Sequence, residues 1–434
     1  MYTYILMLQD FFTSHHVHWF MIFFTLILLR WAIIFFNMLR YKPYTCENKD
    51  FFTSVIIPVL DEPEDLFADV IAKIGAQHPS EIIVLINGPK NEKLESICRR
   101  HNALVENGAL AGTQVRFYHT PIPGKRNAIR EALEQTDEKS DIAILVDSDT
   151  IWTEGTLEEL LRPFSADDKI GGVTTRQKIL KPERCLITMF ADMLEDIRAE
   201  GSMKAMSAVG KVGCLPGRTI AFRTSILRAV IDEFMNEVFM GIHKEVSDDR
   251  SLTNLTLEMG YKTVMQDTSV VYTDAPLQWK KFMRQQLRWS EGSQYNNIRM
   301  TPWMAKHAKL MCFIYWTDML FPMLLISVYV NMATSFVLRH LGHPIIGVTY
   351  NESFLVTLIL IILGCMLGFG VRNLKVFARK PFYYTLLIPV FIVILTIIMT
   401  PIRILGLMRC ADGLGWGTRN LQTVTETSSD KPAS

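Results

Sequence analysis

Long apolar stretches at both ends of the chain, with none in its middle, constrain the fold most. Residues 18–38 are almost continuously apolar apart from Arg30, which makes them long enough to cross a bilayer once as a helix. Further long apolar stretches cover residues 310–338, 354–371 and 382–400. Between about residues 51 and 273 no stretch could span a membrane. The sequence therefore predicts a water-soluble domain held by membrane helices.

The basic residues predict the orientation of the first helix. Arg40 and Lys42 follow it, and no Lys or Arg precedes it, so the positive-inside rule places the N-terminus outside and the middle of the chain in the cytoplasm. No small-residue cleavage site follows this stretch, which favours a retained anchor over a signal peptide. Arg30 is costly inside a bilayer. It either lines a channel or, as we favour, snorkels or pairs with another helix.

The number of later crossings stays open. If each of the three stretches crosses once, the C-terminal tail ends outside, against its own positive charge. Pro322, Pro389 and Pro401 are places where one stretch could break, lie flat or re-enter.

Composition excludes several classes of protein. The net charge of +1 provides no field that would favour nucleic acid as a partner. The seven cysteines lie far apart and show no metal-finger spacing, so we expect reduced thiols.

In the middle of the chain, apolar strand-like runs alternate with helix-like segments. The runs cover residues 54–59, 82–86, 115–118 and 142–146. This alternation predicts an α/β fold with a largely parallel sheet covered by helices. Ligands bind such sheets at the carboxyl ends of the strands, where the polar loops of this region fall.

Two carboxylates, Asp147 and Asp149, directly follow the fourth run. A turn after the strand would let both face one cation. Mg²⁺ and Mn²⁺ prefer carboxylate oxygens and often share their shell with substrate phosphates. Alone, an Asp-x-Asp pair is more often part of a solvated loop, so its weight comes from its surroundings.

Two further segments offer either a site or an ordinary structural element. Lys125 and Arg126 begin a predicted helix after Pro123-Gly124. This helix N-terminus is either simply solvated or binds an anion. Residues 212–219 form either an ordinary turn or a loop that touches an acceptor.

The acidic segment around residues 245–254 has both a capping and a catalytic interpretation. Ser247 or Asp248 can cap a helix, which accounts for one acid. Asp249 or Asp248 could instead serve as the base that deprotonates a hydroxyl group.

Residues 278–300 are amphipathic. One side carries Trp279, Phe282, Met283, Leu287 and Trp289, and the other carries Lys280, Lys281, Arg284 and Arg288. The pattern is typical of a helix in the membrane interface. An indole beside cations also suits sugar stacking and diphosphate pairing.

Six motifs in one order resemble the processive, membrane-embedded family 2 glycosyltransferases, which include hyaluronan, cellulose and chitin synthases. The likeness runs nearly end to end and is greatest to capsular polysaccharide synthases. The motifs are Val55-Ile-Ile-Pro-Val59, Gly124-Lys125-Arg126, Asp147-Ser148-Asp149, Ser247-Asp248-Asp249-Arg250, Gln285-Gln286-Leu287-Arg288-Trp289 and Trp416-Gly417-Thr418-Arg419.

The resemblance implies an inverting enzyme with a GT-A fold that uses a UDP-sugar and Mg²⁺ or Mn²⁺. It implies that Asp147 contacts the nucleotide-sugar and, with Asp149, the metal. Asp249 would be the general base, with Asp248 beside it. The implied nucleotide-sugar contacts are Asp147, Lys125, Arg126, Asn87, Arg288, Trp416 and Arg419, the last two in a gating loop. The implied acceptor contacts are Trp289, Gln285, Gln286, Arg250, Pro216 and Gly217.

Two positions depart from the family pattern. Ile86 stands where the family has an Asp that contacts uracil, so Asn87 or Asp61 is expected to replace that contact. Cys214-Leu-Pro-Gly217 replaces the usual Ser-Gly-Pro of the acceptor loop in hyaluronan synthases.

The resemblance also implies a domain plan and a function. The plan comprises an extracellular segment 1–17, a transmembrane helix 18–39, a GT-A domain 50–275, interface helices 276–308, channel helices 309–402, and a cytosolic gating loop with a disordered tail 403–434. The expected product is a capsular polysaccharide made from UDP-glucose and UDP-glucuronic acid and exported through a bacterial plasma membrane by a multi-pass protein. The alternatives are hyaluronan synthesis, a non-processive transferase and a catalytically silent scaffold.

Overall fold

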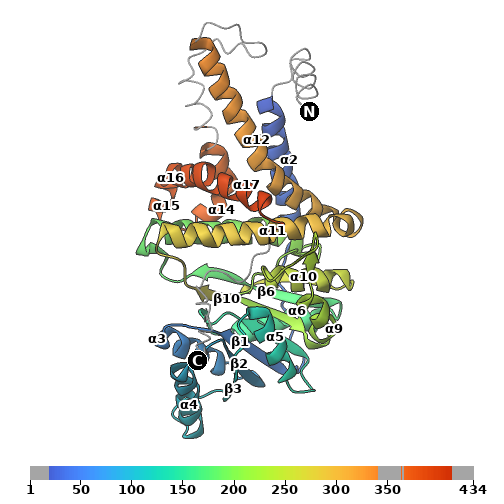
Figure 1. Ribbon diagram of the computed structural model, residues 1–434, viewed down its shortest axis with the longest axis vertical. Coiled ribbons are helices and arrows are strands. Elements are labelled where there is room, and N and C mark those ends of the chain that lie inside the picture. Colours follow the sequence, from blue (N-terminus) through green and yellow to red (C-terminus); the bar gives the residue numbers. More distant parts are fainter. Residues whose placement is uncertain (1–18, 341–362, 364–365, 413–434) are drawn as a thin grey trace, which may run out of the picture.

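The computed structural model describes residues 19–340, 363 and 366–412. An α/β domain forms the lower part of the molecule in Figure 1, and helices α2 (Trp19–Leu39) and α12 (Lys309–His340) extend from it along the longest axis. Trp416 and Arg419, together with the expected N-terminal segment and disordered tail, lie outside the described residues.

The strands predicted from apolar runs are confirmed. They are β1 (Thr53–Val59), β2 (Glu81–Asn87), β3 (Val115–Thr120) and β4 (Ile142–Val146). The remaining strands of the sheet are β5 (Thr150–Trp152), β6 (Ile170–Ile179), β7 (Thr219–Arg223) and β10 (Lys262–Thr273), in the order β3-β2-β1-β4-β7-β6-β10-β5.

The sheet is parallel only in part. β3, β2, β1 and β4 are mutually parallel, as are β6 and β10, but β7 runs antiparallel to both β4 and β6. β5 is also antiparallel to its neighbour β10. The sheet is therefore mixed, and the loop before β7 returns to the end of β4 that carries Asp147.

The continuous apolar runs are explained by burial on both faces of the sheet. Alternate residues of β1 belong to two separate cores: Val55 and Ile57 to one, Ile56 to the other. The covering helices are α3 (Glu64–Gly75), α4 (Glu92–Glu106), α5 (Lys125–Glu134), α6 (Thr156–Ala166), α9 (Thr224–Met235) and α10 (Asp248–Glu258). A separate two-stranded ribbon joins β8 (Val238–Phe239) to β9 (Ile242–His243).

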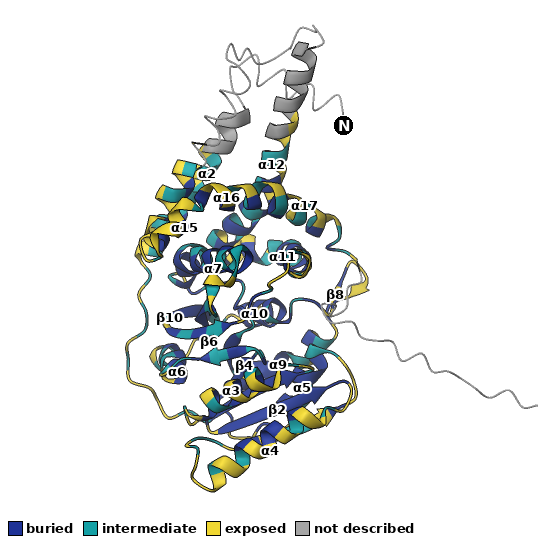
Figure 2. Ribbon diagram, turned by 90° about the vertical axis from the view of Figure 1, so that its left-hand side faces the viewer, coloured by how far each residue is buried: buried dark blue, intermediate teal, exposed yellow. Residues whose placement is uncertain are grey.

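A layer of crosswise helices joins the α/β domain to α2 and α12 (Figures 1 and 2). Its members are η1 (Pro182–Arg184), α7 (Leu186–Arg198), η2 (Ala199–Met203), α8 (Lys204–Ser207), α11 (Trp279–His307), α14 (Leu374–Phe377), α15 (Phe382–Leu386), α16 (Ile388–Val393), η3 (Ile394–Met399) and α17 (Thr400–Met408). Phe190 of α7 contacts Phe282 of α11 and Phe391 of α16, with ring centroids 5.9 and 5.8 Å apart. This apolar core holds the layer together.

The amphipathic segment forms one long helix, α11, that protein covers on two sides. A Cβ added to Gly292 would lie 2.7 Å from the Cβ of Ser247 before α10, and one added to Gly406 of α17 would lie 2.6 Å from the Cβ of Ser290. Such close approaches require glycine. Both the α/β domain and α17 therefore pack directly on α11.

Two helical segments of the described chain are long and apolar enough to cross a membrane, Lys309–Ser327 and Ile388–Met408, and Thr25–Leu39 is a shorter apolar segment. Ile388–Met408 lies across the long axis, roughly parallel to the layer that contains α11 (Figure 1). Most of residues 354–371 lie outside the described residues.

Arg30 forms an ion pair with another helix, which is one of the two outcomes that we favoured from the sequence. Its Nη2 lies 2.6 Å from Oδ1 of Asp318, and its Nε donates a hydrogen bond of 2.9 Å to Oγ1 of Thr317. Both partners belong to α12, so this polar contact joins α2 to α12.

Candidate active site

The two acids that follow β4 converge on one cavity. The N–H of Thr150 donates a 3.0 Å hydrogen bond to the carbonyl of Asp147, which closes a turn directly after the strand. Asp147 and Asp149 therefore both line a cavity of about 1600 Å³ instead of pointing to opposite faces. Ser148 between them donates to Oε1 of Glu62 at 2.9 Å, which ties the turn to the end of β1.

The acids at this end of the cavity lie close enough to affect one another's ionisation. Burial, together with the charges of Asp147 and Glu62, raises the pKa of Asp149 to about 7. Lys125 forms an ion pair with Asp147. Burial lowers the pKa of Lys125, but Asp147 and Asp248 outweigh burial and raise it to about 12.

A divalent cation fits these donors. A buried carboxylate beside two others is stabilised in its ionised form by a cation, and carboxylate oxygens suit Mg²⁺ and Mn²⁺. Among the described residues no three or more His, Cys, Asp or Glu side chains form a complete ligand set. A cation at Asp147 and Asp149 would therefore need further ligands from the substrate, as expected when it is bound together with a diphosphate.

Asp249 is held at the cavity wall. Its Oδ2 accepts a 3.2 Å hydrogen bond from the N–H of Gly217, and Cys214 Sγ lies 3.8 Å from the same oxygen. Its Oδ1 accepts the N–H of Arg250 at 2.8 Å. The loop predicted to touch the acceptor thus packs against the predicted base, with Pro216 and Gly217 also on the cavity wall.

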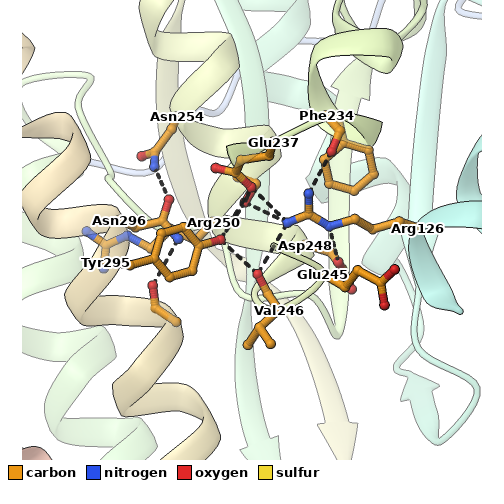
Figure 3. Close-up of polar contacts among 12 residues, drawn as sticks. Arg126, Phe234, Glu237, Glu245, Val246, Asp248, Arg250, Asn254, Tyr295 and Asn296 are labelled. Carbon is orange, nitrogen blue, oxygen red and sulfur yellow. Dashed lines mark hydrogen bonds and ion pairs between the residues drawn. The ribbon is translucent and has the colours of Figure 1, made fainter. Parts of the chain in front are cut away.

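Arg126 does not line the cavity. Its guanidinium is buried behind the site, where it donates to Asp248 at 3.0 Å, to Glu237 at 2.8 Å and to the carbonyl of Phe234 at 2.6 Å (Figure 3). The prediction that it contacts the nucleotide-sugar is not supported by this placement. Neighbouring residues of a helix point about 100° apart, so when Lys125 faces the cavity, Arg126 faces the core.

Asp248 holds this buried network. It is 8 % exposed, and Oδ1 is the acceptor for Arg126. Burial raises its pKa, although Arg126 and Lys125 oppose that shift. Of the two acids in the motif, Asp249 is therefore the one whose Oδ2 contacts the loop of residues 212–219, and Asp248 fixes the start of α10.

Arg250 joins three helices beside the acceptor side of the cavity. It donates to Ser293 at 3.1 Å and to Asn297 at 2.5 Å, both on α11. Its guanidinium lies 4.2 Å from the ring centroid of Tyr315 on α12. The guanidinium of Arg250 is thus bonded to neutral side chains, and its role is to hold these helices together at the cavity wall.

The Gln-Gln-Leu-Arg-Trp segment reaches the same cavity. Gln285, Gln286, Arg288 and Trp289 all line it. Trp289 is 39 % exposed, and its ring centroid lies 5.6 Å from the guanidinium of Arg218. The indole therefore presents a face to the cavity beside a cation.

The sequence interpretation missed Arg218 and its partners. Arg218 Nη1 donates at 2.7 Å to Gln177 and at 2.7 Å to Glu195, and Gln177 donates at 3.0 Å to the carbonyl of Pro216. Burial lowers the pKa of Arg218, but Glu195 outweighs it and raises the pKa. The sequence offered one signal for Arg218, because it directly follows Pro216 and Gly217 in the loop predicted to touch an acceptor. Nothing in the sequence pointed to Glu195 on α7.

Asn87 lies at the end of β2 but not on the wall of the main cavity. It is 1 % exposed, and neither its Oδ1 nor its Nδ2 has a hydrogen-bond partner among the described residues. Buried amides normally find a partner. Asp61 lines a separate, smaller cavity of about 330 Å³, and Asn87 is not on its wall.

The main cavity continues from the acids into the helices. Besides Asp147 and Asp149, it is lined by Arg30 of α2, Phe321 and Pro322 of α12 and other side chains of the crosswise layer. One continuous space thus joins a candidate cation site to the region between the apolar helices.

The family model for "Glycosyltransferase like family 2" matches residues 51–292. The chain belongs to this family. It is a sugar-nucleotide-dependent glycosyltransferase, as predicted from its motifs.

Similar proteins support this assignment. Hyaluronan synthase from Streptococcus pyogenes is 24 % identical over 393 residues, covering 88 % of this chain and 87 % of that protein. An N-acetylglucosaminyltransferase from Azorhizobium caulinodans is 28 % identical over 246 residues, covering 55 % of this chain and 59 % of that protein.

Among solved structures, a mannosyltransferase from Pyrobaculum calidifontis in complex with GDP-Man and Mn²⁺ has a TM-score of 0.56 at 15 % identity. The match covers 91 % of this chain and 99 % of that one. At this identity the likeness concerns the fold, which is GT-A-like, as predicted.

Proposed function

We propose that the protein is a processive, inverting glycosyltransferase that polymerises UDP-glucose and UDP-glucuronic acid into a polysaccharide and passes it between its own helices. The observation that carries this proposal is the single cavity that extends from Asp147 and Asp149 to Arg30 and Phe321. A product that stays in such a space after each transfer remains engaged for the next one.

The residues at the acid end have complementary roles in this proposal. A divalent cation at Asp147 and Asp149 would neutralise the diphosphate leaving group. Lys125 and Arg288 add positive charge on the same wall, where negative charge develops.

The acceptor is deprotonated from the other wall. Asp249 takes the proton of the attacking hydroxyl. The backbone N–H groups of Gly217 and Arg250 hold its carboxylate in place at the cavity wall. The exposed face of Trp289 stacks on the terminal sugar, and Arg218 keeps the indole in place through the contact described above.

The same proposal includes a membrane setting. The apolar helices α2 and α12 would cross a bacterial plasma membrane, and the basic residues after α2 support a cytosolic location for the catalytic domain. Ile388–Met408 would lie along the cytosolic surface, because it runs across the long axis (Figure 1). The gating loop expected at residues 416–419 lies outside the described residues.

Purified full-length protein in lipid nanodiscs tests the donor pair. UDP release and product size on a gel are measured with each UDP-sugar alone and in pairs. We expect long polymer only when UDP-glucose and UDP-glucuronic acid are present together. Short products from every pair would contradict processivity and favour a non-processive transferase.

Variants test the roles of the acids. Asp149→Asn and Asp249→Asn should both abolish polymer, and Asp149→Asn should also abolish the dependence of UDP release on added metal. Asp232→Asn, which changes an exposed acid on α9, is the matched control and should retain activity. Unchanged release in Asp149→Asn would refute the metal assignment, whereas no UDP release from the wild-type protein would favour a scaffold role.

Hyaluronan synthesis is a second candidate. The likeness to the streptococcal hyaluronan synthase over 88 % of the chain favours it. The departure at Cys214-Leu-Pro-Gly217 favours a different acceptor. Polymer from UDP-N-acetylglucosamine and UDP-glucuronic acid that is degraded by a hyaluronan-specific lyase would establish this second candidate over the first.

A further inference from the structure

Two arginines and one aspartate meet where the cavity passes α2 and α12. Arg30 and Asp318 form the ion pair that joins these helices. Arg372, in the helical residues 366–372, lies close enough to interact electrostatically with both of them. All three side chains line the main cavity.

Arg372 forms no ion pair with any described acidic side chain. Among residues 19–340 and 366–412, no acidic side chain lies within ion-pair distance of its guanidinium. Its described close contact is with the ring of Phe369, whose centroid lies 5.6 Å away. Asp318 already accepts a 2.6 Å hydrogen bond from Arg30.

The described charges of this group, two arginines and one aspartate, therefore sum to one positive charge in excess, on an apolar wall. Phe321, Pro322 and Phe369 line the same part of the cavity. A cation in such surroundings is costly unless an anion reaches it. More than a third of the Arg372 residue is accessible, so a ligand in the cavity can contact it.

We propose that Arg372 binds a carboxylate of the growing polysaccharide as it leaves the active site, so that the exported polymer is acidic. The inference rests on the proposed polymerase function and adds a binding site for the carboxylates of its product. A planar guanidinium fork matches a sugar carboxylate with two parallel hydrogen bonds. The diphosphate of the donor has its own cations, Lys125 and Arg288, at the end of the cavity that holds the acids.

Binding of a preformed oligosaccharide tests this without turnover. The probe is a fluorescently labelled octasaccharide of alternating glucose and glucuronic acid, compared with the same octasaccharide after its carboxyl groups are reduced to alcohols. Wild-type full-length protein in nanodiscs should bind the acidic form at least about tenfold more tightly, which is the effect of one charge-assisted hydrogen bond. Equal affinities for the two forms would overturn the inference.

Variants locate the effect. In Arg372→Gln the preference for the acidic form should fall to within about twofold, while Arg372→Lys should keep part of it because the charge remains. Arg100→Gln removes an exposed arginine of α4 and should keep the full preference. A preference that survives in folded Arg372→Gln would assign the carboxylate to another residue and overturn the proposal. If Arg372→Gln does not fold, Arg372→Lys and the wild-type comparison still decide.

The failure of this inference differs from failure of the proposed function. If wild-type protein makes long polymer but binds acidic and reduced probes equally, the carboxylate site is wrong and polymerisation stands. If no pair of donors gives polymer, the proposed function fails, and the inference fails with it.

Discussion

Replacing Arg126 by methionine should destabilise the protein without touching the donor site. The guanidinium holds two carboxylates, Asp248 and Glu237, which are each 8 % exposed. The change would leave Asp248 buried without its ion-pair partner and would leave Glu237 with Arg299 alone, at 3.4 Å. Removing one partner of a buried ion pair costs about 3–5 kcal/mol. With one acid unpaired and the other left with a longer ion pair, we expect a cost within that range, which lowers the thermal midpoint by roughly 6–20 °C.

The assay is thermal unfolding of full-length protein in detergent, followed by intrinsic tryptophan fluorescence. Arg130→Met is the matched control on the same helix: Arg130 donates to Asn127 at 2.7 Å and forms no ion pair among the described residues, so its loss should cost no more than about 1 kcal/mol. Combining Arg126→Met with Glu237→Gln and Asp248→Asn should recover most of the loss, because no buried charge then remains uncompensated. An unchanged midpoint in Arg126→Met together with weaker UDP binding would refute this reasoning and return Arg126 to the donor site.

Three further predictions follow from the site and the helix layer. Because the pKa of Asp149 in the folded chain, about 7, lies above its ordinary value of 3.8, the metal-free protein should lose stability as pH rises from about 4 to 7. The affinity for Mn²⁺ should accordingly rise about tenfold per pH unit up to about pH 7 and stay constant above it. Calorimetry with UDP present measures this affinity. An affinity that does not change with pH below pH 7 argues against Asp149 as a ligand. Trp289→Ala should shorten polymer by about fivefold on a gel while changing UDP affinity less, and polymer of wild-type length and yield would disprove the stacking role. Gly406→Ala places a Cβ 2.6 Å from that of Ser290 and should lower the free energy of unfolding by about 1–3 kcal/mol, measured by thermal unfolding. In the control Gly368→Ala the new Cβ has no described atom within 4 Å, so stability should not fall. Equal thermal midpoints for the two variants would contradict the close packing of α17 on α11.

The sequence by itself determined the features that depend on local pattern. Continuous apolar runs predicted β1 to β4, because strands buried on both faces have no polar side. The turn that brings Asp147 and Asp149 together is also local, since it is closed by a hydrogen bond from Thr150 to Asp147. The amphipathic run predicted α11, and the motif order predicted the family.

Only the tertiary structure decided which neighbours those elements would have. The sequence could not separate Lys125, which faces the cavity, from Arg126, which faces Asp248, because the rotation of α5 is set by what it packs against. It could not place Glu195 beside Arg218, since a contact between α7 and the loop before β7 leaves no periodic trace. The crosswise course of Ile388–Met408 likewise comes from close packing of Gly406 on Ser290. The periodicity of apolar residues indicates which side chains of one helix or strand are buried. It does not indicate which other element they pack against, because that depends on how the side chains fit together in three dimensions.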